Sequence, residues 1–414
     1  MTMTLADLLA PLGPERFFAE YHDRQPLHLR GTPGKFASVL SWRGINRLLD
    51  MTHIWSSQSL QLVLDGTPVP AEQYCGRATG RDNAPVLQPE AARVRDWVRR
   101  GASLVLNDVD SLTPGLASVS AALEGAGLGK AQANVYVSWQ SHKAFPAHFD
   151  THEVWAVQVE GEKTWNIWEG RAEYPIPHPV FRGLGQAHHE KAKGRLREQV
   201  VLRPGDLLYL PRGWYHDALA EAPASVHVAY GVHAPLGMDL VNILMERALY
   251  DAEFRKPLPR QDGGAAARFA LTTRAGQLGQ RLAELCRDPK VMEVLEGFVA
   301  GYRFSRGGND LLAARGLAPE AAPAGAASRG DGEGPPAFRV LAQPGARPVR
   351  RGADWVLKTG GGGTLPLSPA EAEAAGWILA RPDVAEPELR AAHPGVDAPG
   401  LLARLRDAGL LAAA

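Results

Sequence analysis

Cysteine is scarce in this chain, which has two in 414 residues. Cys75 and Cys286 lie far apart and neither belongs to a CxxC pair, so the sequence encodes neither a disulfide framework nor a zinc ribbon. The chain also lacks a basic, apolar leader, and no apolar run approaches the roughly 20 residues that a membrane helix needs. We therefore expect reduced thiols, no membrane span and a cytoplasmic protein.

An excess of charge of either sign is also absent. Lys plus Arg and Asp plus Glu both number 45, so the formal net charge is zero. The sequence therefore carries no strong nucleic-acid signal, because phosphate binding needs concentrated positive charge. A hydrophobic content of 45% and a charged content of 22% are those of a globular protein, and the length predicts two or three domains.

Short β segments bounded by Gly and Pro fill the stretch from about 102 to 235. Six of them stand out, ASLVLNDV, ANVYVSW, EVWAVQVEG, KTWNIW, VVLRPGDLLYLPRG and SVHVAYGVH. Many short strands separated by turn residues predict a barrel or jelly roll. The fold class is therefore α+β, with a jelly-roll core that helices accompany.

The rest of the chain is mainly helical. Apolar residues recur at helical spacing in LVNILMERAL and VMEVLEGFVAGY, and the stretch GLAPEAAPAGAASRGDGEGPPA has the composition of a linker. Ser368 and Glu371 then form a capping box around Pro369, which opens a small helical or winged-helix-like module. The predicted division is a helix and strand extension of the core at 1–90, the barrel at 91–236, a helical region at 237–312, a flexible linker at 313–337 and the module at 338–414.

Histidines concentrate in the β region, where nine of the thirteen lie between 142 and 233. In AHFDTHEVW, strand alternation would point His148 and Asp150 the same way, about 7 Å apart along the chain. His216, in RPGDLLYLPRGWYHDAL, follows an apolar strand and a turn, and is the candidate third ligand. Two histidines and a carboxylate leave three positions open on an octahedral ion, as in non-heme iron(II) oxygenases.

Two simpler interpretations of these residues stay open. One HxD among thirteen histidines is expected by chance, and His148 would then hydrogen-bond to Asp150 without any metal. Zinc is the other candidate ion, but three ligands and a water would complete a tetrahedral hydrolytic site. A bidentate 2-oxo acid and dioxygen would instead fill the open positions on iron(II).

A longer segment resembles a known family. ANVYVSWQSHKAFPAHFDTHEVWAVQVEGEKTWNIWEG, followed by LRPGDLLYLPRGWYHDA, is similar to the JmjC-type cupin segment of the ribosomal oxygenases, which are protein hydroxylases. GASLVLNDVDSLTPGL and, more loosely, FFAEYHDRQPLHLRG extend the resemblance to roughly 15–235. It implies a double-stranded β-helix, Fe(II) bound by His148, Asp150 and His216, and 2-oxoglutarate as cosubstrate.

The resemblance also assigns residues around the metal. It places Lys163 against the distal carboxylate of 2-oxoglutarate, and Asn134 and Tyr136 in the cosubstrate and substrate pocket. A cation would compensate a buried dicarboxylate, and the alternative is that Lys163 only caps the EGEK turn, where lysines are commonly exposed. Asn134 and Tyr136 share one strand face, and polar groups there also serve to satisfy neighbouring backbone groups.

The match has departures, and further histidines lie nearby. His22 stands where the family commonly has Trp, and Ala229 and Gly231 replace residues that often carry hydroxyls. We expect His227 to reach the same cavity and to support the ligands without binding the metal. Five other histidines nearby are interpreted as mainly solvated or structural, namely His142, His152, His188, His189 and His233.

These observations predict an Fe(II)- and 2-oxoglutarate-dependent oxygenase that hydroxylates a side chain of a protein or peptide, with ribosomal protein and biosynthetic precursor peptide both open. Succinate and CO2 would be the other products. A metal-dependent cupin isomerase or epimerase, and a non-catalytic cupin scaffold with a binding C-terminal module, are the alternatives. The apolar surplus of 237–312, together with the resemblance, predicts a homodimer.

Overall fold

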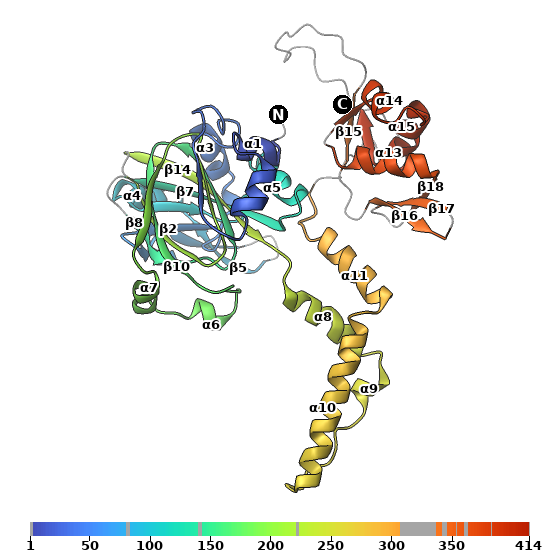
Figure 1. Cartoon of the computed structure of the whole chain (residues 1–414). Helices are drawn as coiled ribbons and strands as arrows, with labels where there is room; N and C mark the ends of the chain where they lie inside the picture. The colour runs from blue at the N-terminus through green and yellow to red at the C-terminus, as the bar shows by residue number, and fades with distance from the viewer. Residues whose placement is uncertain are drawn as a thin grey trace. The chain divides into compact units, whose positions relative to one another are not determined.

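The computed structural model describes residues 3–79, 83–139, 143–220, 223–306, 337–341, 346–352, 354–359, 363–381 and 383–413. It divides into two compact units, Met1–Pro235 with Tyr302–Phe304, and Leu236–Gly301 with Ser305–Ala414 (Figure 1). The finer five-part division stays a prediction, and all but the last residue of the expected linker 313–337 lies outside the described residues. No helix in the described ranges has the length and apolarity to cross a membrane.

Two antiparallel sheets form the barrel of the first unit, as the strand pattern predicted (Figure 1). The larger sheet has the order β1-β12-β9-β14-β7-β6-β2-β3 and the smaller one β11-β10-β13-β8. Their strands are β1 (Leu27–Leu29), β2 (Leu60–Leu64), β3 (Thr67–Pro68), β6 (Ser103–Leu106), β7 (Lys130–Trp139), β8 (Lys143–His148), β9 (Glu153–Glu160), β10 (Lys163–Arg171), β11 (Leu196–Leu202), β12 (Leu207–Leu210), β13 (Trp214–Ala220) and β14 (Ala224–His233).

The side chains of β9 alternate between two apolar cores. Trp155 and Val157 face the main core outside the barrel, whereas Val154 and Ala156 belong to a second cluster inside it. Both faces are therefore buried, which explains the nearly continuous apolar sequence of this strand. The tight turn into β10 needs Gly161, whose φ is +60° and where a Cβ would lie 1.9 Å from the carbonyl oxygen of Ala224.

Short helices and a hairpin accompany the two sheets. Thr113 caps α5 (Pro114–Gly125) by accepting a hydrogen bond from Leu116 N, and Pro114 occupies the first turn. The other elements of this unit are α1 (Leu5–Leu9), α2 (Pro14–Arg16), η1 (Phe17–Tyr21), α3 (Trp42–Asp50), η2 (Thr52–Ile54), η3 (Ala71–Gln73), the hairpin β4 (Cys75–Thr79) and β5 (Pro85–Pro89), α4 (Ala91–Arg99), α5 (Pro114–Gly125), α6 (Pro179–Arg182) and α7 (Gln186–Ala192). Helices α6 and α7 form the polar insert between β10 and β11.

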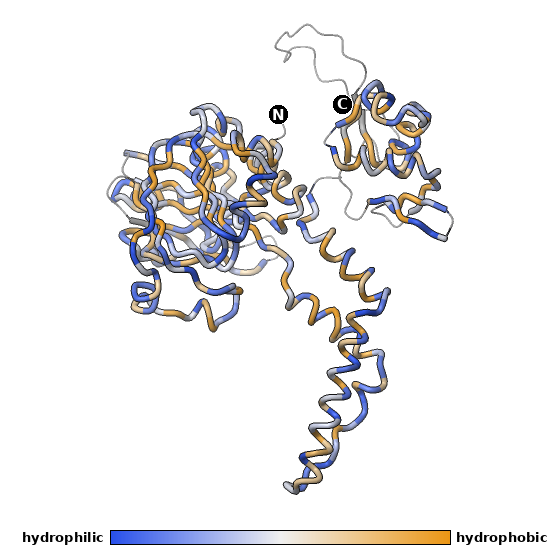
Figure 2. Tube along the Cα trace, in the orientation of Figure 1, coloured by the Kyte–Doolittle hydropathy of each residue, from blue (hydrophilic) through white to orange (hydrophobic). Residues whose placement is uncertain are grey.

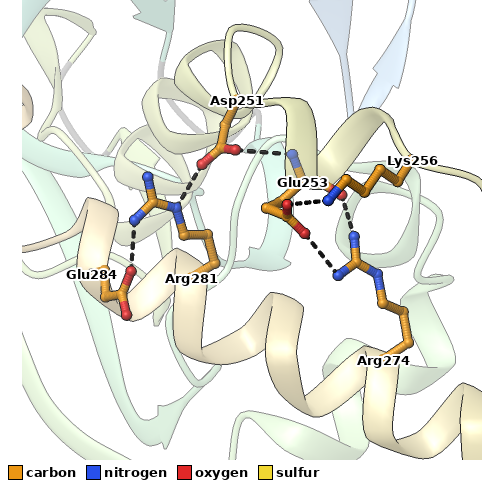
Figure 3. A network of polar contacts seen from close by, with 6 residues as sticks. All are labelled: Asp251, Glu253, Lys256, Arg274, Arg281 and Glu284. Atoms are coloured by element: carbon orange, nitrogen blue, oxygen red, sulfur yellow. Dashed lines mark hydrogen bonds and ion pairs between the residues drawn. The ribbon is translucent and has the colours of Figure 1, made fainter.

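The second unit begins with helices α8 (Gly237–Ala248), α9 (Ala252–Arg255), α10 (Ala265–Leu285) and α11 (Pro289–Ala300). Ion pairs fasten α9 to α10, since Arg281 contacts Asp251 and Arg274 contacts Glu253 (Figure 3). Figure 2 shows that apolar residues are frequent along α8 and α11. Only a small buried cluster, Leu244, Ala248, Leu285 and Val291, lies between these helices.

The C-terminal module has its own core, which includes Leu357, Ile378, Leu389 and Leu405. Its elements are β15 (Ala337–Val340), β16 (Arg347–Arg351), β17 (Asp354–Lys358), β18 (Thr364–Leu367), α13 (Pro369–Leu379), β19 (Asp383–Ala385), α14 (Glu386–Ala392), α15 (Ala398–Asp407) and β20 (Leu411–Ala413). The predicted capping box is present, because Ser368 and Glu371 bond reciprocally at the start of α13. Helices beside two small sheets agree with the expected winged-helix-like module.

Candidate metal centre

The smaller sheet brings the three predicted ligands together. His148 ends β8 and pairs directly with His216 of β13, and their ring centroids are 4.5 Å apart. Asp150 follows two residues after β8, and the Nε2 of His216 lies 3.4 Å from its Oδ2. One ligand atom from each residue lies within 4.8 Å of the others, so all three can bind a single ion.

A backbone bond links the two segments that carry these residues. Gly213, in the turn before β13, donates its N–H to the carbonyl oxygen of Asp150 at 2.9 Å. Its φ is +85°, and a Cβ would approach the carbonyl oxygen of Ala172 to 2.2 Å. Glycine is therefore required at the point where the turn meets the loop that holds Asp150.

Both imidazoles are oriented by carbonyl oxygens. The Nδ1 of His148 lies 2.8 Å from the oxygen of Pro146, and the Nδ1 of His216 lies 2.9 Å from that of Trp214. A carbonyl only accepts, so in each neutral ring the proton is on Nδ1 and the Nε2 lone pair is available for a metal. Such bonds fix the tautomer and direction of ligating histidines.

The electrostatic environment favours the same ionisation states. Burial lowers the pKa of His216 to about 4, with a further decrease from His148, so this imidazole is neutral near pH 7. Burial raises the pKa of Asp150, but the imidazoles of His152, His148 and His216 outweigh it, and the net pKa is below the usual value. Neutral imidazole and carboxylate are the forms that bind metal.

A cavity of about 150 Å³ lies between the two sheets beside these residues. The larger sheet contributes part of its wall, and the smaller sheet and the loop after β8 contribute the rest. The lining residues are Asn134, Tyr136, Phe145, His148, Asp150, His152, Val154, Lys163, Trp165, His216, Ala218, His227, Ala229 and Gly231. A larger hollow, of about 470 Å³, is lined by Asn166 and Asp217 on the other face of the smaller sheet and includes none of the three candidate ligands.

Lys163 extends into the barrel interior and is only 3% exposed. Its Nζ donates to the Oγ of Ser138 at 3.1 Å and lies 3.5 Å from the Nδ1 of His227. Among the described residues no carboxylate forms an ion pair with it, and burial lowers its pKa to about 7. The alternative that Lys163 caps an exposed turn is therefore wrong.

Asn134 and Tyr136 line the same cavity from β7. The Oδ1 of Asn134 accepts the backbone N–H of Asp108 at 3.1 Å, so this side chain also satisfies a neighbouring loop. Tyr136 stacks on His227 with ring centroids 4.8 Å apart, and burial raises its pKa to about 12. Its phenol is therefore neutral and able to donate a hydrogen bond into the cavity.

The other histidines differ in their surroundings. His227 is buried in the cavity wall as expected, and burial holds its pKa well below the ordinary value. His188 is exposed, which agrees with its interpretation as a solvated residue, and His142 lies outside the described residues. His152 differs from that interpretation, because its ring lines the cavity. Sequence reasoning also missed Trp165, which lies beside the ring of His216 at 5.6 Å.

The donor set fits iron(II) with a chelating 2-oxo dicarboxylate. Two neutral imidazoles and one carboxylate would occupy three positions, and the cavity adjoins the remaining ones. Lys163 offers a buried positive charge in the same cavity, where an anionic end of such a molecule needs compensation. We therefore consider both groups compatible with the residues present.

Comparison with known proteins shows what the chain is similar to. Residues 118–240 match the JmjC domain. The bifunctional lysine-specific demethylase and histidyl-hydroxylase NO66 of Drosophila persimilis is 28% identical over 236 residues, which are 56% of this chain and 31% of that protein. Ribosomal oxygenase 1 of Gallus gallus is 29% identical over 262 residues, covering 61% and 41% respectively. The chain thus spans less than half the length of either relative.

The fold has solved counterparts. The structure of ycfD from E. coli aligns with a TM-score of 0.52 over 97% of this chain and 98% of its own, at 16% identity. A second structure of that ribosomal oxygenase, in complex with cobalt and 2-oxoglutarate, aligns with a TM-score of 0.50 and 16% identity over 96% and 97%. These alignments confirm the predicted fold class. Residues 118–240 of the chain therefore match the JmjC domain, and the chain is similar to the ribosomal oxygenases.

Proposed function

We propose that this chain is an Fe(II)- and 2-oxoglutarate-dependent oxygenase. The observation that carries the proposal is the presence in one cavity of the triad His148, Asp150 and His216 and of the buried ammonium of Lys163. Iron(II) and 2-oxoglutarate, when bound, would supply dioxygen activation, with release of succinate and CO2. The JmjC match over 118–240 supports the same chemistry.

The chain's own residues would bind and orient these groups. His148, Asp150 and His216 hold the metal, and the two Nδ1 bonds to backbone carbonyls keep the Nε2 atoms directed towards it. Lys163 binds the distal carboxylate of 2-oxoglutarate, and Tyr136 and Asn134 complete the wall on that side. The apolar cluster inside the barrel, which includes Val154 and Trp165 of the cavity wall, would exclude water from that wall.

The proposed substrate is a side chain of a protein or peptide, which would be hydroxylated. The names of the relatives support this class, since one is a histidyl-hydroxylase and demethylase and the other a ribosomal oxygenase. Ribosomal protein and a biosynthetic precursor peptide are the two candidate sources. We also propose that the protein is cytoplasmic and forms a homodimer. A cupin isomerase or a scaffold would not require a buried lysine beside the metal.

Succinate formation tests the proposed function. Anaerobically purified protein given Fe(II), 2-oxoglutarate and then oxygen should form succinate in proportion to the oxygen consumed. Candidate peptides should increase the rate and gain the mass of one oxygen atom. His148→Ala should abolish metal binding and turnover together, because two ligands hold the ion far more weakly than three. If iron-loaded wild type neither binds nor consumes 2-oxoglutarate with any candidate peptide, the proposal is wrong.

A further inference from the structure

His152 lies in the wall of the cavity, on the side of the candidate metal ligands. It lies two residues after Asp150, in the loop that leads into β9, and is half-buried. Its Nδ1 lies 2.9 Å from the carbonyl oxygen of Glu153. It lines the cavity together with His148 and Asp150, so its ring borders the space that a substrate side chain must enter.

Gly231 on β14 makes room for this ring. A Cβ at Gly231 would lie 2.8 Å from the Cε1, 2.9 Å from the Nδ1 and 3.1 Å from the Nε2 of His152. Distances this short are not tolerated by a rigid ring held by a backbone bond. The imidazole therefore occupies the volume that any larger residue at 231 would take, inside the wall of the cavity.

His233 supports the ring from a second side. The ring centroids of His152 and His233 are 4.8 Å apart, with planes at 59°. Burial lowers the pKa of His233 to about 4, so it adds no positive charge beside His152 near pH 7. The position of His152 is thus set by three contacts, with the Glu153 carbonyl, Gly231 and His233.

The hydrogen bond to the Glu153 carbonyl determines which nitrogen of His152 can accept a further hydrogen bond. A carbonyl oxygen only accepts hydrogen bonds, so in the neutral ring the Nδ1 carries the proton and the Nε2 has a lone pair. Within the described part of the chain, no residue hydrogen-bonds to this Nε2. An acceptor that is half-buried, held in place and adjacent to the candidate metal ligands can serve an incoming group.

We propose that His152 is a positioning residue for the substrate, whose Nε2 accepts a hydrogen bond from an N–H or O–H of the side chain to be oxidised. The inference rests on the proposed function for the identity of the reaction. The hydrogen bond to His152 would make the cavity bind side chains that carry an N–H or O–H donor more tightly than hydrocarbon or carboxylate side chains. Gly231 takes part indirectly, since it keeps the imidazole at its position.

Paramagnetic line broadening can test this selection without turnover. Protein loaded with Mn(II) in place of iron, with 2-oxoglutarate and without oxygen, is mixed with the Nα-acetyl amides of Arg, His, Asn, Leu and Glu. Broadening of their side-chain proton signals reports approach to the metal. We expect the three donor compounds to bind roughly threefold to tenfold more tightly than the Leu and Glu compounds, the effect of one hydrogen bond.

Variants separate hydrogen bonding from packing. His152→Phe keeps a ring over Gly231 but removes the acceptor, and Gly231→Ala displaces the ring, so both should abolish the preference for donors. His152→Gln, which retains an acceptor, should restore part of it. His188→Phe, at an exposed position on α7, should behave like the wild type. The affinity for 2-oxoglutarate should stay unchanged in His188→Phe, which lies outside the cavity lining.

Two results would overturn the role of His152. One is equal broadening of all five compounds, or of none, by the wild type, and the other is a donor preference that survives in His152→Phe. The broadening arises from Mn(II) alone, so the comparison can be repeated with the Mn(II) protein without 2-oxoglutarate. Failure of 2-oxoglutarate to bind would therefore count against the proposed oxygenase, while the comparison of the five compounds would still decide the role of His152.

Discussion

At the scale of single residues, the ammonium of Lys163 has a hydroxyl as its hydrogen-bond acceptor in place of a carboxylate. Ser138 accepts its bond, and burial lowers its pKa to about 7. A carboxylate placed against this ammonium would favour the charged form and raise the pKa again. Binding of a dicarboxylate is therefore linked to the protonation of Lys163.

This linkage predicts how the affinity for 2-oxoglutarate depends on pH. Below about pH 7 Lys163 is already charged in the free protein, so affinity should be constant. Above that pH a proton must be taken up on binding, and affinity should fall by up to about tenfold per pH unit. Anaerobic titration calorimetry of the Mn(II) protein at several pH values, in buffers of different ionisation enthalpy, measures both the affinity and the proton uptake.

Lys163→Met provides the control for this prediction. It should weaken 2-oxoglutarate binding by about 10- to 100-fold, the effect of losing a hydrogen bond to a charged group, and should remove the pH dependence. Metal affinity should not change, because Lys163 is not among the three candidate ligands. An affinity for 2-oxoglutarate that is flat from pH 6 to pH 9 in the wild type would contradict the assignment.

The sequence predicted some of these residues and missed others for physical reasons. Strand parity and the turn before β13 were enough to select His148, Asp150 and His216, although β8 ends at His148 and Asp150 belongs to the following loop. The alternation of side chains along a strand does not show which of its two faces lines the cavity. His152 and Trp165 were missed because the cavity wall is assembled from strands that are far apart in the chain.

At the scale of elements, the segment η1 packs on the larger sheet through an unusual polar contact. The Nε2 of His22 lies 3.2 Å from the Oε1 of Glu153, which is buried and also accepts the hydroxyl of Tyr209. Phe17 of η1 packs on the Tyr209 ring beside it, with centroids 4.9 Å apart. His22, which stands where the ribosomal oxygenases commonly have Trp, therefore compensates the buried carboxylate of Glu153.

The contact between His22 and Glu153 makes stability depend on pH. The hydrogen bond to Glu153 raises the pKa of His22, and burial opposes this shift. A raised pKa stabilises the fold fully below the unfolded value of about 6.5, and the contribution is lost as pH rises through the folded pKa. The free energy of unfolding should therefore fall by under about 1 kcal/mol above that pH, because His22 is partly exposed.

Thermal unfolding across this pH range checks the His22 prediction. Asp23 and Arg24 beside His22, and Arg171 bound to Asp23, also face this contact, so the comparison must isolate His22 itself. His22→Gln can still donate to Glu153 but does not titrate, and its melting temperature should lose that part of the pH dependence. His53→Gln, at an exposed histidine, should keep it. Identical pH profiles for wild type and His22→Gln would contradict the prediction.

The elements of the C-terminal module show where sequence reasoning reaches its limit. Its three helices follow from caps and apolar spacing, as at Ser368. Its strands are only three to five residues long, and β15 pairs with β19 and β20, which follow more than 40 residues later. Such short strands have no period of their own, so pairing between distant segments determines them.

At the scale of the whole molecule, a balanced charge and a large exposed apolar surface occur together. Val241 and Met245 of α8 and its C-cap residue Leu249 are spaced by four, so they share one helix face, and Met245 is 57% and Leu249 67% exposed. Tyr250 and Phe269 of the same helical region are also exposed, and the ion pairs of Figure 3 hold α9 against α10. Exposed apolar residues gathered on one helix face favour association, and no net charge opposes self-association.

We therefore expect a homodimer that buries this helical surface. Light scattering after gel filtration should give about twice the chain mass of 44.6 kDa. Met245→Glu combined with Leu249→Glu should give a monomer, because two carboxylates cannot be buried without partners. Glu246→Gln, on the same helix, should remain a dimer.

The monomeric variant should still bind Mn(II) and 2-oxoglutarate, since His148, Asp150, His216 and Lys163 all belong to the other unit. A wild type of single-chain mass at micromolar concentration would contradict the dimer, and loss of metal binding in the double variant would indicate unfolding in place of dissociation.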